Sequence, residues 1–408
     1  MSQEANKSTA ISILKKLRKA GYQSLFAGGC VRDMLLGSRP HDYDIATDAT
    51  PDQVAAIFRR TIMVGAQFGV AMVMQKDHMC EVATFRNDDS YSDGRRPDSV
   101  TFSTPKEDAL RRDFTINGMF FDPIENKVID FVGGQTDLKK NIIRTIGNPC
   151  QRFAEDHLRI MRAIRFATRL NFEIEPQTFN AIKKFAPKIV EISGERIFDE
   201  LNKMFTKDSA HIAFAQLEKT KIAQKILPEL FENKNQFDIA LKLLSAVSKF
   251  KKPILNFGAI LFYLNKKQIK KIIRRWGQSN NLLRSLIYFV ENNNRWENAA
   301  SIELCDFKRL ISNSDWELLR KLFRSAEFLE TYKNTQSIRI AKRVNKIDPK
   351  LISPKLFVTG EDLKQLGLTE GRKLGAILRK LTDSQLNEEL TSRAQALKLA
   401  KKLVAELN

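Results

Sequence analysis

The sequence contains few of the side chains from which proteins build disulfide frameworks or zinc sites. Its 408 residues include four cysteines and four histidines, and no two cysteines form a Cys-x-x-Cys pair. Scattered cysteines argue against a zinc knuckle and favour a reducing compartment. His41-Asp42 is a His-Asp dipeptide, but no histidine cluster accompanies it. The composition therefore argues against a His-rich metal site and against a metal-dependent phosphohydrolase of the His-Asp type.

Long apolar runs are also missing. No apolar segment approaches the ~18 residues that a membrane-spanning helix needs. The first ten residues, MSQEANKSTA, are polar and lack the apolar core of a signal peptide. We therefore expect a cytoplasmic protein without membrane contact.

A large excess of positive charge is present instead. Lys and Arg number 68 against 48 Asp and Glu, which gives a formal net charge of +20. Such an excess favours a polyanionic partner such as nucleic acid, although a merely soluble basic protein is the alternative. Hydrophobic residues make up 43% of the chain, so a disordered chain is excluded. The length predicts about two to four domains at roughly 100–200 residues each.

The hydrophobic pattern changes near residue 145. Before it, short strand-like runs are separated by turns, and after residue 150 almost every segment has a helical period. A polar segment rich in turn residues, 87–99, predicts a loop. The expected strands are residues 23–27, 43–46, 70–75, 80–85 and 127–132, with a short helix over 31–36. The sequence thus predicts an α+β fold with a mixed-sheet head followed by a long helical remainder.

Two motifs in the head combine acidic residues with a glycine turn. Asp42 and Asp44 are two positions apart on an expected strand, so their carboxylates share one face, where a cation such as magnesium would relieve their repulsion. The alternative is a solvated acidic pair. Gly28-Gly29 follows a strand, where backbone amides can approach a phosphate, and Arg32 adds a charged donor. Alone, such a glycine pair is usually a tight turn, but the combination is more specific.

These motifs resemble the nucleotidyltransferase superfamily that includes DNA polymerase beta. More narrowly, the chain resembles class II tRNA nucleotidyltransferases (CCA-adding enzymes) and bacterial poly(A) polymerases. The residues that carry the resemblance are Gly28-Gly29 with Arg32, Asp42 and Asp44, the block Arg111-Arg112-Asp113-Phe114-Thr115-Ile116-Asn117, the connection Gly133 to Pro149, and Glu155-Asp156 with Arg159, Arg162 and Arg165. The resemblance is dense over residues 23–205 and thinner beyond.

The resemblance implies an organisation and a set of site residues. It implies a catalytic head (1–146), a neck with the nucleotide-recognition helix (147–208), a helical body (209–345) and an RNA-binding tail (346–408). It implies that Arg112 contacts the nucleotide. Asp113 has two readings, because it is either a third catalytic carboxylate or a brace for the helix beside Arg112.

The pattern of the Glu-Asp-x-x-Arg block predicts an amphipathic helix without reference to any family. Apolar residues Ile160, Ile164 and Ala167 form one stripe, and Arg159, Arg162 and Arg165 lie opposite. A solvated basic face is the alternative. Asp156 lies close enough to Arg159 on the wheel for an ion pair. Such a pair could accept from the exocyclic amine that cytosine and adenine share, and the resemblance implies this selection of CTP and ATP without a template. His157 is assigned no role.

Several short segments favour CCA addition within the family. The loop Asp93 to Asp98, with Arg95 and Arg96, resembles the loop that CCA-adding enzymes need for the final A. The segment 64–69 resembles their glycine turn, 192–201 resembles their Ile-Ser-x-Glu-Arg-Ile block, and 358–375 resembles their tail motif. Such motifs overlap between subfamilies, so poly(A) polymerase and CC-adding or A-adding enzymes remain alternatives.

A basic helix is expected in the body, ahead of Trp276. It could follow RNA phosphates, or it could be a solvated helix with an aromatic anchor. Its cations are Lys266, Lys267, Lys270, Lys271, Arg274 and Arg275.

The predicted reaction is attack of the tRNA 3′-hydroxyl on the α-phosphate of CTP or ATP, with release of pyrophosphate. Two magnesium ions held by Asp42 and Asp44 would assist, while Gly29 and Arg32 would hold the triphosphate. An RNA-binding protein with an inactive transferase head is the alternative from another class. The intact set of Asp42, Asp44, Arg32 and Arg112 argues against it. The sequence leaves the oligomeric state open.

Overall fold

The computed structural model describes residues 3–63, 69–75, 78–88, 100–329 and 336–406. It divides the chain into two compact units, residues 1–228 and 229–408. The predicted division into head, neck, body and tail, with boundaries at residues 146, 208 and 345, is finer than these two units and stays a prediction. None of the helices in the described part of the chain has the length and apolar character that a membrane span requires.

The first unit is built on a seven-stranded mixed sheet. The strand order is β3-β4-β5-β2-β1-β8-β9, and β2 pairs with β5 in parallel while the other neighbours are antiparallel. The strands are β1 (Ser24–Ala27), β2 (Ile45–Thr47), β3 (Thr61–Ile62), β4 (Val70–Gln75), β5 (His78–Thr84), β8 (Met119–Asp122) and β9 (Lys127–Asp130). The predicted mixed-sheet head is confirmed.

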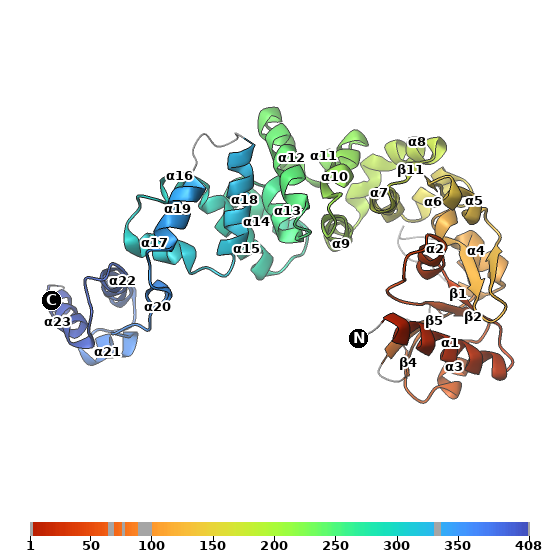
Figure 1. The fold of residues 1–408 in the computed structure, drawn as a ribbon, viewed down its shortest axis with the longest axis horizontal. Coiled ribbons are helices and arrows are strands. Elements are labelled where there is room, and N and C mark those ends of the chain that lie inside the picture. Colours follow the sequence, from red (N-terminus) through yellow and green to blue (C-terminus); the bar gives the residue numbers. More distant parts are fainter. Residues whose placement is uncertain (1–2, 64–68, 76–77, 89–99, 330–335, 407–408) are drawn as a thin grey trace. The chain divides into compact units, whose positions relative to one another are not determined.

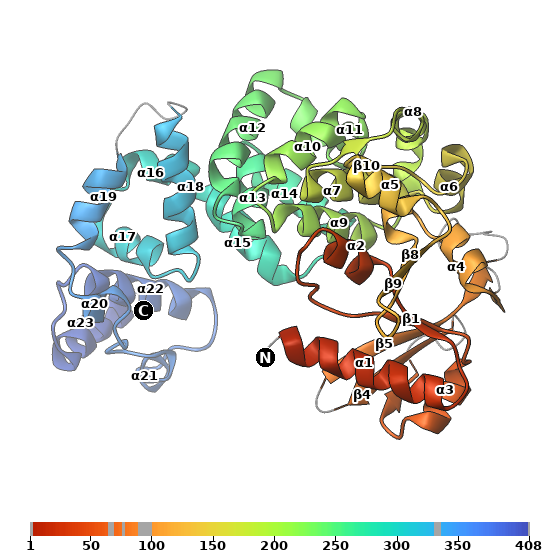
Figure 2. The same ribbon diagram turned by 45° about the vertical axis from the view of Figure 1, so that its right-hand side comes forward.

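Helices cover both faces of this sheet. Helices α1 (Gln3–Lys19) and α3 (Pro51–Ile57) contact each other and lie against the same side, as Figures 1 and 2 show. On the central strands, α4 (Pro105–Arg111) contributes Ala109 to a buried cluster with Phe85 and Phe120. Phe85 and Phe120 meet edge to face, with ring centroids 5.8 Å apart. This packing fixes the strand ends from which the site residues project.

The strand expected at 43–46 begins later than predicted. The structure places β2 at Ile45–Thr47, and the pairing of β1 with β2 ends where Ala27 N donates to Asp44 O at 3.0 Å. Beyond Ala27 the chain turns at Gly28, so Tyr43 and Asp42 have no further ladder partner in β1. Tyr43 instead packs its ring on Phe26, with centroids 5.2 Å apart. The strand predicted at 70–75 is confirmed as β4.

The remainder of the first unit is mostly helical. Its further elements are α2 (Gly29–Leu35), β6 (Arg86–Asp88), β7 (Val100–Phe102), η2 (Thr115–Asn117), α5 (Gly134–Lys139), β10 (Ile142–Ile143), α6 (Pro149–Glu155), α7 (Leu158–Leu170), β11 (Glu173–Ile174), α8 (Pro176–Phe185), η3 (Ala186–Glu191), α9 (Gly194–Phe205), α10 (Ala210–Lys219) and α11 (Ile222–Ile226). Helix α7 is the centre of this helical part, since it contacts α6, α9 and α10.

The second unit is helical over its described residues. After η4 (Pro228–Phe231), its helices are α12 (Lys234–Ser248), α13 (Pro253–Ile260), α14 (Lys266–Arg275), α15 (Asn280–Glu291), α16 (Asn293–Asn298), α17 (Leu304–Ile311), α18 (Trp316–Phe328), α19 (Gln336–Val344), α20 (Pro349–Ile352), α21 (Gly360–Gln365), α22 (Arg372–Leu386) and α23 (Arg393–Ala405). The C-terminal helices have a core of their own around Leu363, Leu381 and Ala400. The predicted helical remainder is confirmed.

Candidate active site

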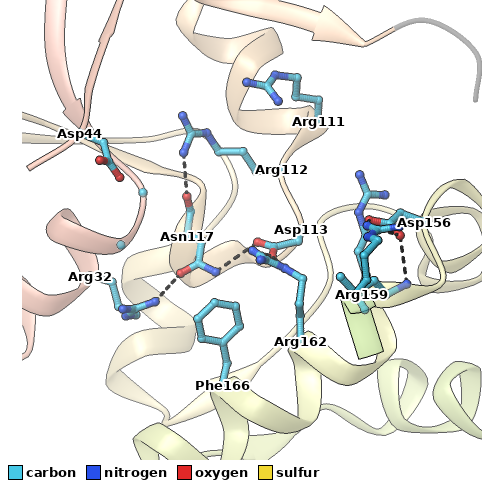
Figure 3. A pocket seen from close by; sticks show the side chains of 14 residues that line it. Arg32, Asp44, Arg111, Arg112, Asp113, Asn117, Asp156, Arg159, Arg162 and Phe166 are labelled. Carbon is cyan, nitrogen blue, oxygen red and sulfur yellow. Dashed lines mark hydrogen bonds and ion pairs between the residues drawn. The ribbon is translucent and has the colours of Figure 1, made fainter. Parts of the chain in front are cut away.

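A cavity of about 480 Å³ in the first unit gathers most of the predicted site residues. Figure 3 shows side chains from the sheet, from the segment after α4 and from α7 converging on it. The predicted residues that line it are Gly28, Gly29, Arg32, Asp44, Arg112, Asp113, Asp156, Arg159 and Arg162. Segments far apart in the sequence are therefore brought to one place, as the motifs predicted.

The glycine turn shapes one wall of the cavity. Gly28 has φ +71°, a conformation that side-chain-bearing residues rarely adopt, and a Cβ there would lie 3.0 Å from Arg112 Nη1. Helix α2 begins at the next residue and carries Arg32, which is only 3% exposed. The Arg32 guanidinium donates to Asn117 Oδ1 at 2.7 Å and to Asp33 Oδ1 at 2.6 Å. The turn thus brings backbone and a fixed cation to the cavity wall.

The two aspartates of the acidic motif differ in environment. Asp44 lines the cavity, whereas Asp42 has a side chain 77% exposed and forms an ion pair with His41 at 3.0 Å. Burial, followed by the nearby Glu81 and Asp42 carboxylates, raises the pKa of Asp44 to about 6, and Arg112 opposes the shift. The raised pKa of Asp44 thus comes first from its burial and second from the Glu81 carboxylate.

Glu81 was missed by the sequence analysis. It lies on β5, and the parallel register pairs Ile45 with Val82, so Glu81 lies one step earlier, opposite Asp44. The charge of its carboxylate acts directly on the pKa of Asp44. A single acidic residue in the apolar run Cys80 to Phe85 was the available signal. Recognising it required the strand register, which the sequence alone does not reveal.

The carboxylate set can be tested for its fit to a metal ion. Within the described residues, no three His, Cys, Asp or Glu side chains form a ready-made metal cage. Magnesium is commonly bound through only one or two carboxylates together with substrate phosphates. Asp44 and Asp42, with the negative charge of Glu81 beside them, therefore suit a divalent cation that a nucleotide helps to bind.

A buried carboxylate of α4 holds the two arginines at the end of that helix, Arg111 and Arg112. Asp108 Oδ2 accepts from Arg112 Nε and Nη2 at 3.0 and 2.8 Å, and Asp108 Oδ1 accepts from Arg111 Nη2 at 2.6 Å. Although burial would raise it, the two guanidiniums hold the pKa of Asp108 below its usual value. The Arg112 guanidinium also lies 5.2 Å from the Phe120 ring centroid. Arg112 is thus held at the cavity wall, and its contact with a nucleotide stays a prediction.

The contacts of Asp113 favour its bracing role. Its Oδ1 accepts from Phe114 N at 2.8 Å and from Asn117 Nδ2 at 3.1 Å, and its Oδ2 accepts from Arg162 Nε and Nη2 at 2.8 and 2.5 Å. Burial alone would raise the pKa of Asp113, but Arg162 holds it below its usual value. Each of its oxygens already accepts two hydrogen bonds. Asp113 therefore links the segment after α4 to helix α7 (Figure 3).

The helical wheel drawn through Asp156 assumes a continuous helix at that residue, but the structure has a break there. Helix α6 ends at Glu155 and α7 begins at Leu158, while Asp156 has an extended backbone at φ −146°. Asp156 Oδ1 accepts from Leu158 N at 3.0 Å, so the carboxylate stabilises the first turn of α7. The helical wheel drawn through Asp156 is therefore wrong at its first position, because the side chain caps the helix rather than belonging to it.

Two arginines of α7, Arg159 and Arg165, are buried in ion pairs. Arg159 and Arg165 are 7% and 8% exposed, so a solvated basic face is excluded. Arg159 pairs with Glu155, and Arg165 Nε donates to Glu200 Oε2 at 2.6 Å. Arg165 does not line the cavity that contains Asp44 and Arg112, because its pairing with Glu200 directs it to α9.

Asp156 has a partner that the sequence analysis did not assign. Arg196 Nη2, from α9, donates to its two carboxylate oxygens at 2.9 and 3.1 Å. Arg196 belongs to the Ile-Ser-x-Glu-Arg-Ile block, which was read only as a subfamily marker. His157 contacts Phe153 O at 2.5 Å and Glu191 at 3.3 Å, which gives it a place in the packing of α6.

The structure describes only one of the two groups of predicted RNA-binding residues, the basic helix. Arg95 and Arg96, with the segment 64–68, lie outside the described residues. The basic helix is confirmed as α14, with Ile269 and Ile272 buried and Trp276 1% exposed at its end. Three of its cations pair with acidic residues, namely Lys266 with Glu291 at 2.6 Å, Lys271 with Glu229 at 3.6 Å and Arg275 with Glu229 at 2.9 Å.

The sequence matches two known families. The family described as "Poly A polymerase head domain" matches residues 24–144, and the family described as "Probable RNA and SrmB- binding site of polymerase A" matches residues 171–233. The first match spans Gly28, Asp44 and Arg112, and thus the part of the cavity that the head supplies.

Curated proteins are similar over two thirds or more of the chain. The CCA-adding enzyme of Ligilactobacillus salivarius (strain UCC118) is 35% identical over 386 residues, which cover 91% of this chain and 90% of that protein. The CCA-adding enzyme of Streptococcus suis (strain 05ZYH33) is 38% identical over 283 residues, which cover 69% and 70%.

Solved structures share the fold. The Bacillus stearothermophilus CCA-adding enzyme, solved in complex with CTP, superposes with a TM-score of 0.78 at 28% identity and covers 97% of each chain. The Thermotoga maritima CCA-adding enzyme, solved with tRNA, has a TM-score of 0.65 at 21% identity, and its likeness shows the fold alone.

Proposed function

This chain belongs to the CCA-adding enzyme family, and we propose from this premise that it adds C, C and A to the 3′ end of tRNA. CTP and ATP are the substrates, and pyrophosphate is released. The observation that carries the proposal is the cavity in which Asp44, Arg32 and Arg112 meet Asp156. Acidic groups for phosphoryl transfer, cations for a triphosphate and a carboxylate for base selection thus line one space.

The triphosphate is the natural ligand of the cavity wall near the glycine turn. Gly28 and Gly29 leave room for phosphate oxygens to approach the backbone, because no Cβ projects there. Arg32 and Arg112 supply charged donors whose positions are set by Asn117 and Asp108. Such preorganised donors stabilise charge as it develops in the transition state, without reorganisation during the reaction.

The acidic residues serve the reacting centre. Asp42 and Asp44 would hold magnesium together with the nucleotide phosphates, and Glu81 adds negative charge beside Asp44. When bound, magnesium supplies Lewis-acid polarisation of the α-phosphate and favours the ionised 3′-hydroxyl. The protein positions the 3′-hydroxyl in line with the α-phosphate, and the bond to pyrophosphate breaks as the new phosphodiester forms.

Base selection is assigned to Asp156 and Arg159. Both line the same cavity as Arg112, so a nucleotide whose phosphates lie at Arg32 can extend its base toward α7. The Asp156 carboxylate accepts from the amine of cytosine or adenine, whereas uracil and guanine present a carbonyl there. Arg196 holds this carboxylate in place before the base arrives. Arg162, pinned by Asp113, supports the same wall.

The remaining assignments follow from composition and from free cysteines. The net charge of +20 supports tRNA as the polyanionic partner, with α14 and the segment containing Arg95 and Arg96 as contributors. All four cysteines are free thiols, which supports a reducing, cytoplasmic location.

An incorporation assay with three nucleotide mixtures tests this function. The acceptor is a tRNA that ends before CCA, supplied with CTP alone, ATP alone or both in the presence of magnesium. CCA addition predicts two additions with CTP, a third when ATP is added, and little extension with ATP alone. Repeated addition from ATP alone would indicate a poly(A) polymerase, and arrest after CC would indicate a CC-adding enzyme. No incorporation in any mixture would leave only an RNA-binding role.

A further inference from the structure

The second unit carries a groove between α12 and α18 that the sequence motifs did not indicate. The two helices contact each other, as Figures 1 and 2 show, and the groove encloses about 440 Å³. The side chains that matter here are Lys249, Phe250, Arg320, Lys321, Arg324 and Phe328. Four of these six side chains are cationic and two are aromatic.

The charge of this groove is less compensated than that of α14. No acidic residue lines it within the described part of the chain. Arg320 pairs with Glu317 at 2.8 Å, an exposed contact within one helix that has little net energy. The Lys249 and Lys321 ammonium groups each lie 5.4 Å from the Phe250 ring centroid, so an aromatic ring rather than a carboxylate organises them. The groove therefore keeps its positive charge available for an anion.

An exposed aromatic ring stands beside these cations. Phe328 is the last residue of α18 and is 86% exposed. Single exposed hydrophobic residues are common and need no explanation by themselves. The combination of a solvent-exposed ring with clustered Lys and Arg is different, because it matches how proteins bind unpaired nucleotides. There, cations follow the backbone phosphates and an aromatic side chain stacks on a base.

We propose that this groove binds an unpaired loop nucleotide of the tRNA. Phe328 stacks on its base, while Lys249, Lys321 and Arg324 contact the adjoining phosphates. The inference rests on the proposed function, since it takes tRNA as the substrate. Paired bases in an A-form helix are stacked inside it, whereas unpaired bases expose a face on which an aromatic ring can stack. The proposed function places the unpaired 3′ end in the active-site cavity, which leaves the loops as the source of the base.

Binding measurements with two RNAs test the proposal. One RNA is a full-length tRNA without its CCA end, and the other is a two-strand duplex of the acceptor-stem sequence with the same 3′ overhang and no loop. Phe328→Ala should weaken the Kd for tRNA about 5- to 150-fold, because one base–aromatic stack contributes ~1–3 kcal/mol. The Kd for the duplex should not change. Phe328→Tyr keeps the ring and should bind tRNA as the unmodified protein does.

Two controls separate this effect from general changes in the protein. Ile338→Ala removes another exposed apolar side chain in the same unit, 61% exposed, and should leave both Kd values unchanged. Lys249→Gln should reduce the slope of log K against log salt for tRNA by about 0.7–0.9, the value for one phosphate contact. Lys242→Gln, at an exposed position of α12 outside the groove, should leave the slope unchanged.

The outcomes distinguish failure of the loop-contact proposal from failure of the proposed function. An unchanged Kd for tRNA in Phe328→Ala, or an equal loss on the duplex, overturns the loop contact. In either case the unmodified enzyme would still add nucleotides to the duplex. Absence of nucleotide addition to both RNAs by the unmodified enzyme contradicts the proposed function itself.

Discussion

Arg196 and Asp156 form an ion pair, with Nη2 and Oδ2 2.9 Å apart, that joins α9 to the junction of α6 and α7. The pair lines the cavity together with Arg112. Asp156 also accepts from Leu158 N, so its carboxylate is fixed from two directions before a nucleotide binds. A carboxylate held in this way can discriminate between an amine and a carbonyl without moving.

Replacing Asp156 should therefore relax base selection. Asp156→Ala removes the acceptor for the amine of C and A, and each such contact is worth roughly 1–3 kcal/mol. The ratio of kcat/KM for CTP to that for UTP should fall about 10- to 100-fold. If Asp156 only caps α7, every nucleotide loses rate in proportion and the ratio stays flat.

Arg196 offers a related test. Arg196→Ala leaves Asp156 in the chain but frees its carboxylate to take other orientations. We expect the same ratio to fall, by less than in Asp156→Ala, while Arg196→Lys retains a charge and part of the selection. The four kcat/KM values for CTP and UTP in the two variants decide this. Unchanged selection in Arg196→Ala would mean that the helix cap alone fixes Asp156.

The acidic motif should be needed for chemistry and not for RNA affinity. Asp44→Ala and Asp42→Ala should each reduce nucleotide transfer by ~10³-fold or more, because the metal ions serve the reacting phosphate. The Kd for tRNA should change little, since the basic surfaces supply affinity. Single-turnover incorporation and filter binding measure the two quantities separately. Near-normal turnover in either variant would remove that residue from the metal site.

Asp113 should behave as a brace whose loss destabilises the fold. Asp113→Asn leaves Arg162 without its carboxylate partner, and we expect a loss of about 2–3 kcal/mol in the free energy of unfolding. This is less than the ~3–5 kcal/mol of a fully buried pair, because the Arg162 side chain is 34% exposed. Urea unfolding at pH 7 measures the difference.

The pH dependence of stability gives Asp113 a second readout. Arg162 lowers the pKa of Asp113 in the folded state, so folding favours its ionised form. The resulting stability is present above the unfolded-state pKa of about 3.9 and is lost as the pH falls through the lower folded-state pKa. The difference in stability between the unmodified protein and Asp113→Asn should therefore shrink below about pH 4. A difference that is constant with pH would indicate that the ion pair contributes nothing.

The sequence predicted the parts of the site that depend on local patterns. The glycine turn at Gly28, the strand at Val70–Gln75 and the basic helix α14 are each set by neighbouring residues, through backbone conformation and hydrophobic period. The pairing of Asp156 with Arg196 joins residues 40 positions apart, and the position of Glu81 beside Asp44 depends on the register of two parallel strands. Such relations arise from tertiary packing, which a single sequence does not display.

The burial of arginines on helix α7 was also not predictable from the local sequence pattern. The wheel separated an apolar stripe from an arginine face and allowed that face to be solvated. In the structure Arg159 and Arg165 of that face are buried and Arg162 is partly buried, because carboxylates such as Asp113 and Glu200 reach α7 from other segments. Burial of a charged face depends on ion-pair partners from elsewhere in the chain, and the hydrophobic periodicity of the helix does not predict those partners.

The charges of α14 allow a matched test of its predicted role in RNA binding. Among the cations of α14, Lys266, Lys271 and Arg275 pair with Glu291 and Glu229. The other three are Lys267, Lys270 and Arg274, which line a cavity beside the helix together with Lys266 and Lys271. Changing Lys267, Lys270 and Arg274 to Gln should lower the slope of log K against log salt by up to about 0.9 for each phosphate that the protein no longer neutralises. Changing the paired three to Gln should lower the slope less, because their charge is already offset by carboxylates.

The two triple variants carry the same net charge, so a difference in slope between them reports local interactions with RNA rather than overall charge. Equally reduced slopes in both variants would indicate that α14 acts only through the overall positive potential of the protein. Unreduced slopes in both would indicate that other surfaces bind the phosphates.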